Sequence, residues 1–246
     1  MIGRNSLLVI ARRAVARQSS SQPWRRLLRC CFATPRNGIL LFLLSSFLLA
    51  SCSTSTPPPS TPEVVSVYSS SAAEPWLSEL YDCGAQQNNI LSRVDDPSTA
   101  DISLRVGEPE LLSVPAFQID TEEILIVTHR QSPIQNLSLE QAQTLFAQGD
   151  PSVQVWVYAS EADVQEVFDQ LVMDGRNVTS SAKIAANPQQ MSETLVNESN
   201  TVGILPRHWK VGDSRFVFTI PNIPVLALTR SEPQGVIKEL ISCLQK

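Results

Sequence analysis

The stretch EILIVTHRQSPIQNLSLEQAQTLFAQGD, residues 123–150, decides the fold, because a buried strand leads into a clearly delimited helix. Residues 121–129 are the most apolar strand in the sequence. Ser138 and Gln141 have the spacing of a capping box, and Gly149 is a natural helix stop. One apolar stripe lies between them: Leu139, Ala142, Leu145 and Phe146. A strand followed by a helix is the building unit of an α/β protein.

Strands and helices alternate on both sides of this unit. The other expected strands lie at 64–68, 90–94, 101–106, 153–159, 201–205, 215–220 and 224–229. The other expected helices lie at 71–83, 160–172, 187–198 and 232–245. Residues 64–246 are enough for one sizeable core, or for two small lobes that share a hinge. The interleaving predicts an α/β fold.

The charge of the chain is strongly uneven along its length. Residues 1–51 hold 8 of the 19 Lys and Arg, so 11 basic residues face all 24 acidic ones beyond that point, a net charge near −13. A nucleic-acid-binding protein needs a basic surface, so this class is excluded. Electrostatic attachment to an anionic membrane is excluded as well.

The N-terminal segment has the order of a secretory signal. Arginines precede the uncharged run 38–50, and Leu49-Ala50-Ser51-Cys52 resembles the bacterial lipobox. This resemblance implies that 1–51 is a lipoprotein signal peptide, that Cys52 carries acyl chains, and that the protein faces the outside of the cytoplasm in a bacterial envelope. An ordinary signal peptide with a chance cysteine is the alternative. Residues 52–63, rich in Ser, Thr and Pro, are expected to form an extended tether.

Two cysteines, Cys83 and Cys243, remain in the exported part of the chain. An even pair in an oxidising compartment predicts a disulfide, and two buried thiols on separate helices are the alternative. The two histidines, His129 and His208, belong to no Cys/His cluster, so neither a zinc site nor a cofactor is expected.

Two strand-to-helix turns have similar sequences, YSSSA at 68–72 and YASEA at 158–162. Ser71 with Glu74, and Ser160 with Asp163, have capping-box spacing, so each serine is expected to cap its helix. The alternative is ligand binding, because helix N-termini and hydroxyls favour anions and carbonyl groups. The candidate ligand-binding residues are Ser69, Ser70, Ser71, Tyr158 and Ser160. Both turns lack the glycines of a hydrolase nucleophile elbow, so no catalytic residue is assigned and the protein is not expected to be an enzyme.

The stretch 123–150 also resembles the hinge strand and following helix of phosphate-type solute-binding proteins of ABC importers. The matching positions are Leu137, Glu140, Gln141, Leu145, Phe146 and Gly149. VWVYASEADVQEVF and TVGILP match later segments of that family in the right order. The resemblance implies a type 2 periplasmic-binding-protein-like fold with two small α/β lobes joined by a hinge, one formed by 64–127 and 202–246, the other by 128–201. The helices of Cys83 and Cys243 would then share a lobe.

The function implied by this resemblance is a lipid-anchored receptor that delivers a small anionic or polar solute to an ABC permease. The second turn departs from the family pattern, because no arginine occurs in 153–163 and Glu161 places a carboxylate at the anion site. Such a carboxylate disfavours phosphate by roughly 1 kcal/mol or more. The alternative is an envelope lipoprotein that uses the same fold for sensing or for protein interaction.

Overall fold

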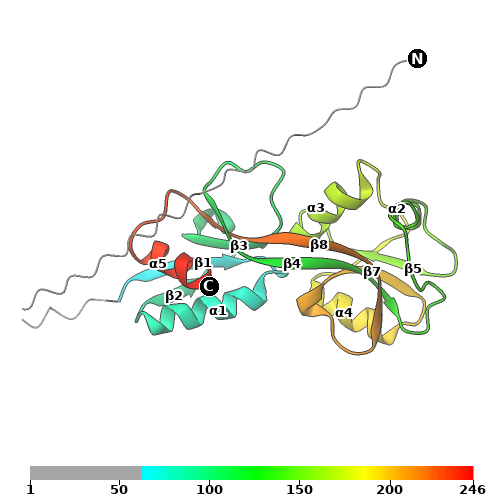
Figure 1. Ribbon diagram of the computed structural model, residues 1–246, viewed down its shortest axis with the longest axis horizontal. Coiled ribbons are helices and arrows are strands. Elements are labelled where there is room, and N and C mark those ends of the chain that lie inside the picture. Colours follow the sequence, from blue (N-terminus) through cyan, green and yellow to red (C-terminus); the bar gives the residue numbers. More distant parts are fainter. Residues whose placement is uncertain (1–61, 246) are drawn as a thin grey trace, which may run out of the picture. The chain divides into compact units, whose positions relative to one another are not determined.

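In a computed structural model, the described residues 62–245 form one eight-stranded mixed sheet with five α-helices (Figure 1). The predicted signal segment 1–51, the lipidation site Cys52 and the tether as far as residue 61 lie outside the described residues. Among the helices of 62–245, no helix has the length and hydrophobicity needed to cross a bilayer.

The strand order is β2-β1-β3-β8-β4-β7-β5-β6. The strands are β1 (Val64–Ser69), β2 (Ile90–Arg93), β3 (Ile102–Val106), β4 (Ala116–His129), β5 (Gln154–Val157), β6 (Lys183–Ile184), β7 (Thr201–Pro206) and β8 (Ser214–Thr229). β1 pairs in parallel with β2 and β3, and β5 pairs in parallel with β6 and β7. Two parallel groups therefore flank the antiparallel pair β4 and β8.

The long strands β4 and β8 run through both halves of the sheet and join two lobes. The C-terminal part of β8 pairs with β3, whereas the C-terminal part of β4 pairs with β7. We use "first lobe" for the part around β1–β3 and "second lobe" for the part around β5–β7. The predicted lobe limits at 127/128 and 201/202 stay predictions. Strand β7 begins at the second limit and lies between β4 and β5 in the sheet.

Strand β8 corrects one expectation from the sequence. The segments 215–220 and 224–229, expected as two strands, belong to one strand of 16 residues. Pro221 and Pro224 suggest an interruption, because proline cannot donate to a ladder. Asn222 has a φ of 59°, and the register with β4 shifts between Glu122 and Ile124. This irregularity lets the strand continue past both prolines.

The helices are α1 (Glu74–Gln86), α2 (Leu139–Gln148), α3 (Asp163–Phe168), α4 (Pro188–Asn197) and α5 (Gly235–Leu244). A π-helical turn, η2 (Asp169–Met173), continues α3, and short 3-10 turns η1 (Pro97–Thr99) and η3 (Arg207–Trp209) lie in loops. In Figure 1, α1 and α4 lie below β4 and β8, and α2 and α3 lie above them. The predicted capping box of Ser138 and Gln141 at α2 is confirmed, and the side chain of Asn187 caps α4.

Buried side chains from both lobes form one continuous hydrophobic core. The rings of Phe146 on α2 and Phe168 on α3 lie 4.7 Å apart between centroids and pack in the second lobe. Trp76 and Leu80 of α1 are buried in the first lobe. Each such side chain stabilises the fold by roughly 1.5–3 kcal/mol relative to exposure.

A disulfide joins Cys83 of α1 to Cys243 of α5, with 6.1 Å between the Cα atoms. The two cysteines are 160 positions apart in the sequence, so the bond ties the first helix of the fold to the last. Both helices belong to the first lobe, which leaves the second lobe without a covalent link among the described residues.

Candidate functional site

A cavity of about 410 Å³ lies between the two lobes, at the ends of the strand-to-helix turns. Its walls are formed by Tyr68, Ser70, Ser71, Pro97, Ser103, Arg105, Ala159, Glu161, Ala162, Asp163, Ala186 and Leu228. The turn after β1 supplies one wall and the turn after β5 supplies the other. Four other cavities, of about 360–590 Å³, are each lined by one lobe alone. The cavity between the lobes is therefore the candidate site.

Ser70 is the most strongly connected hydroxyl of the first turn. Its Oγ accepts a hydrogen bond from the Ala73 N–H at the start of α1, at 3.3 Å. The same Oγ donates to Asp163 Oδ2 across the cleft, at 2.5 Å. Its backbone N–H donates to the Leu104 carbonyl, which fixes the turn against β3.

Asp163 connects the two lobes through its carboxylate. Oδ2 accepts from Ser70 Oγ and also from the Val106 N–H at the end of β3, at 2.8 Å. Oδ1 accepts from the Val164 N–H in its own helix, at 2.9 Å. The residue is only 7% exposed, so these charge-assisted bonds replace the water that a buried carboxylate would otherwise need.

A second bridge, one turn further along α3, joins the same two elements. Arg105 Nη2 lies 2.7 Å from Glu166 Oε2, and the Glu110 N–H donates to Glu166 Oε1 at 2.6 Å. Burial alone would raise the pKa of Glu166, but the bonds from Arg105 and Glu110 outweigh it and lower this pKa. Arg105 Nε also donates to the Gly107 carbonyl, so its guanidinium is held by the protein.

The predicted binding serines separate into two groups. Ser69, Ser70 and Ser71 lie in the first turn, and of these Ser70 and Ser71 line the cavity. Ser69 is buried and its Oγ donates to the Ser70 carbonyl. Ser160 is exposed and its Oγ donates to Glu161 Oε2 at 3.2 Å; it does not itself line the cavity, although its neighbours Ala159 and Glu161 do.

The expectation that Ser71 and Ser160 cap their helices is wrong. Helix α1 begins at Glu74 after Ala73, and helix α3 begins at Asp163 after Ala162; neither has a side-chain cap. Each serine therefore lies too far before its helix to reach the N-terminal N–H groups. In the first turn the neighbouring Ser70 supplies the hydroxyl acceptor instead.

The two tyrosines at the strand ends differ in environment. Tyr158 is 4% exposed, and its hydroxyl has no hydrogen-bond partner among the described residues. Burial, followed by the charge of Asp163, raises its pKa well above 10.0. Tyr68 lines the cavity, and burial followed by Asp163 also raises its pKa. Both hydroxyls stay neutral near pH 7, and Tyr68 rather than Tyr158 faces the cavity.

Sequence reasoning missed the roles of Arg105, Asp163 and Glu166. Asp163 was assigned to helix capping, so its reach across the cleft was not expected. Arg105 gave one usable signal, because it is the one basic residue of the expected strand 101–106. Only the folded arrangement brings β3 and α3 together.

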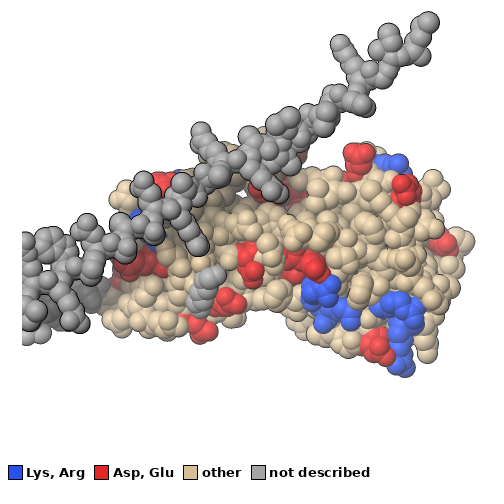
Figure 2. All heavy atoms as spheres, viewed as in Figure 1, with Lys and Arg blue, Asp and Glu red and all other residues tan. Residues whose placement is uncertain are grey.

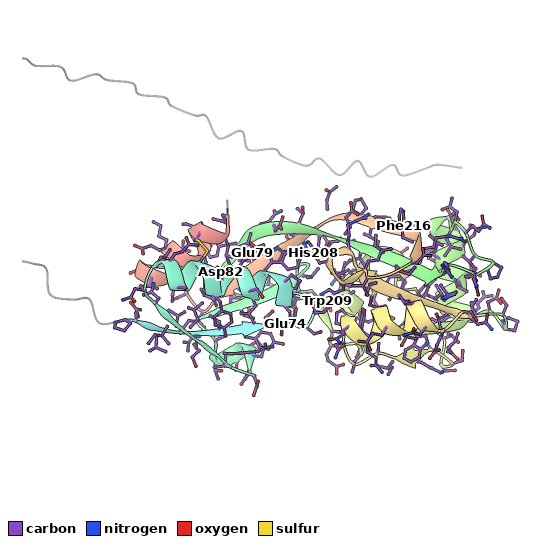
Figure 3. The ribbon with its side chains drawn as sticks, turned by 90° about the horizontal axis from the view of Figure 1, so that it is seen from below. Glu74, Glu79, Asp82, His208, Trp209 and Phe216 are labelled. Atoms are coloured by element: carbon purple, nitrogen blue, oxygen red, sulfur yellow. A yellow bond between two sulfur atoms is a disulfide. The ribbon has the colours of Figure 1, made fainter. Side chains whose placement is uncertain are left out.

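On the other side of the cleft, a polar and aromatic cluster links η3 to α1. Trp209 Nε1 donates to the Ala72 carbonyl at 3.0 Å, and the His208 ring lies 4.6 Å from that of Trp76. His208 Nδ1 lies 2.8 Å from Oε2 of Glu122, which is buried in β4. Figure 3 shows His208 and Trp209 beside the end of α1 that carries Glu74.

The described residues contain no group of His, Cys, Asp or Glu that could hold a metal ion.

The surface charge is unevenly distributed. On the face in Figure 2, the larger groups of basic side chains lie at the α4 end, whereas acidic side chains are spread over both ends. The cavity itself has Glu161 and Asp163 on one wall, and its one lining cation is Arg105.

A scan against models of protein families and a search of curated sequences find no match for this chain. Solved structures do resemble it. A Clostridium perfringens protein, assigned as a phosphate ABC transporter substrate-binding protein and solved with bound phosphate, superposes with a TM-score of 0.64 at 13% identity. The alignment covers 74% of this chain and 93% of that one. An ABC-type phosphate transport receptor from Vibrio cholerae gives 0.58 at 14% identity, with the same coverage.

A third structure comes from a different functional class. The regulatory domain of OxyR2 from Vibrio vulnificus superposes with a TM-score of 0.56 at 9% identity, over 75% of this chain and 97% of that domain. At such identities the likeness is one of fold. The expected fold class, an α/β protein of the periplasmic-binding-protein type 2 with two lobes, is confirmed.

Proposed function

We propose that this chain is a solute-binding lipoprotein of the bacterial cell envelope. Its cleft binds a small polar solute and hands it to an ABC permease, and acyl chains on Cys52 hold it to the membrane. The observation that carries the proposal is the cavity of about 410 Å³ between two lobes joined by β4 and β8. Two proteins with this fold have names that state phosphate transport.

The lining of the cavity supports a small polar solute. Tyr68, Ser71 and Ser103 offer hydroxyl groups, which both donate and accept hydrogen bonds. The apolar part of the lining comes from small or aliphatic residues such as Pro97, Ala162 and Leu228. A site with several convergent polar groups and a volume near 400 Å³ has the size range of small-ligand pockets.

The test is a thermal-melting screen of the purified full-length protein against inorganic phosphate, other oxyanions, and small organic solutes. A true ligand at about 100 times its Kd adds about 2.7 kcal/mol to the unfolding free energy. A Ser103→Trp variant, which fills the cavity from β3, is expected to lose the response. If no solute shifts the melting of the unmodified protein, the receptor function is refuted.

Sensing or protein interaction without transport is the second candidate. Two observations favour it: the lobes are bridged by their own residues, and a regulatory domain shares the fold. Chemical cross-linking in the native membrane separates the two functions. A permease subunit cross-linked to the protein supports transport, whereas cross-links only to other envelope proteins support the second candidate.

A further inference from the structure

The polar centre of the cleft is occupied by a side chain of the protein itself. One hydroxyl donor, Ser70 Oγ, and one backbone donor, the Val106 N–H, converge on a single oxygen of Asp163. Both donors belong to the first lobe, and the carboxylate comes from the second. Converging hydroxyl and backbone N–H donors are the groups that proteins use to bind oxyanions. In this protein the oxyanion that these donors bind is the Asp163 carboxylate.

The remaining charges of the cavity do not favour an anion either. Glu161 stands beside Asp163 on the second wall. Arg105, the cation of the lining, has its Nη2 on Glu166 and its Nε on the Gly107 carbonyl. A free anion would therefore meet two carboxylates and an arginine that is already paired. The hydroxyls of Tyr68, Ser71 and Ser103 are donors that a solute can use without breaking these pairs.

We infer that the Asp163 carboxylate is a built-in substitute for an anionic ligand. The cleft therefore rejects oxyanions and selects a small solute that donates hydrogen bonds and has no negative charge, such as an amine or a polyol. This inference rests on the proposed solute-binding role of the cleft and names its substrate class. Selectivity of this kind comes from a repulsive group as much as from attractive ones.

The rejection of oxyanions and the selection of a solute without negative charge have one physical cause. A phosphate placed at Ser70 and Val106 would displace the carboxylate and leave it buried without those two partners. Leaving a buried charge unpaired is strongly unfavourable. A neutral or cationic solute can instead bind beside the carboxylate and use its free lone pairs and the nearby hydroxyls.

The test compares phosphate binding by the full-length protein and by an Asp163→Ala variant, using calorimetric titration and thermal melting. The unmodified protein is expected to show no response to millimolar phosphate. The variant frees Ser70 and Val106 and removes a charge, so its apparent affinity for phosphate is expected to rise at least about tenfold. Asp169→Ala is the matched control, because it removes a carboxylate just beyond α3 that does not line the cavity. If Asp163→Ala fails to fold, Asp163→Ser gives the same comparison, because its shorter, uncharged side chain also withdraws the acceptor from Ser70 and Val106.

Each outcome separates this inference from the proposed function. A gain of phosphate binding in the Asp163 variant alone supports the inference, even if no solute binds the unmodified protein and the receptor function fails. Phosphate binding by the unmodified protein, or a gain that Asp169→Ala shares, overturns the inference while leaving a receptor function open. An Asp163→Ala or Asp163→Ser variant that folds and still ignores phosphate overturns it as well.

Discussion

The turns YSSSA and YASEA have similar sequences and equivalent places after β1 and β5, yet they contribute opposite chemistry to the cleft. The first turn supplies a donor, the hydroxyl of Ser70, whose position is set by α1 and β3. The second turn leads into Asp163, which supplies the acceptor. The serine of the second turn, Ser160, stays exposed. Equivalent position in a repeated strand–turn–helix unit therefore does not imply an equivalent role.

The two turns also differ in how firmly their helices are held. Helix α1, after the first turn, has 13 residues and is tied to α5 by the disulfide. Helix α3, after the second turn, has 6 residues and continues as a π-helical turn. The contacts of α3 with β3 are the hydrogen bonds of Asp163 and Glu166 and the packing of Val167 on Gly107. The first lobe contains the disulfide, whereas α3 is held to the first lobe by side-chain contacts alone.

The largest expected effect concerns the covalent link of the first turn's helix. Replacing Cys83 and Cys243 by serine opens a link across 160 residues of sequence. The unfolding free energy is expected to fall by about 4 kcal/mol, because the unfolded chain regains conformational freedom. Urea denaturation of the oxidised protein and the double variant measures the loss. Reductant should destabilise the unmodified protein and leave the double variant unchanged; equal sensitivity of both would contradict the prediction.

Gly107→Ala breaks the contact between α3 and the first lobe. Gly107 has a φ of 81°, and a Cβ there would lie 2.1 Å from Val167 Cγ2. Overpacking and backbone strain together are expected to cost about 2–4 kcal/mol. Gly175→Ala is the matched control, since its φ is 79° but no atom lies within 4 Å of the added Cβ, so its cost should be about 1 kcal/mol. Thermal melting compares the two variants, and equal losses would mean that the α3 contact contributes nothing.

Much of the fold could be predicted because its signals are local. The capping box of Ser138 and Gln141, the Asn187 cap and the alternation of strands and helices depend on residues close together in sequence. The single strand β8 could not be predicted, because whether Pro221 and Pro224 interrupt a strand depends on the register of its partner β4. Local patterns do not carry that information.

The candidate site could be predicted only in outline. The two turns were located from the sequence, but the pairing of Ser70 with Asp163 spans 93 residues and the pairing of Arg105 with Glu166 spans 61. Asp163 also has the right spacing from Ser160 for a capping box, and that local interpretation hid its role across the cleft. Contacts between lobes follow from tertiary packing, which a strand-by-strand interpretation does not fix.

Ser70→Ala tests the donor of the first turn. Removing the hydroxyl leaves Asp163 Oδ2 with the Val106 N–H alone and leaves the Ala73 N–H with only the Ser70 carbonyl as acceptor, so a loss of about 1–2 kcal/mol is expected. Ser71→Ala is the matched control: Ser71 is exposed, and a surface change of this kind stays within about 0.5 kcal/mol. Chemical denaturation gives both values. A Ser71 variant as damaging as the Ser70 variant would remove the distinction between the two hydroxyls.

The smallest expected effect is a pH dependence from Glu166 in the second turn's helix; the serine hydroxyls of the first turn do not titrate in acid. The pKa of Glu166 lies below its ordinary value of 4.5, so the folded protein keeps this carboxylate charged to lower pH than the unfolded chain does. Its contribution to stability is therefore complete above about pH 4.5 and is lost as the pH falls through the folded-state pKa. The Glu166 side chain is 26% exposed, so its contribution to the unfolding free energy is expected to be below about 1 kcal/mol.

The measurement compares the unfolding free energies of the unmodified protein and Glu166→Gln. Their difference should be constant from pH 5 to 7, in the range where the carboxylate is charged in both states, and should shrink in more acidic buffer. A difference that grows on acidification would show that Arg105 and Glu110 do not stabilise the charged form, and α3 would then be held to the first lobe by Asp163 and apolar packing alone.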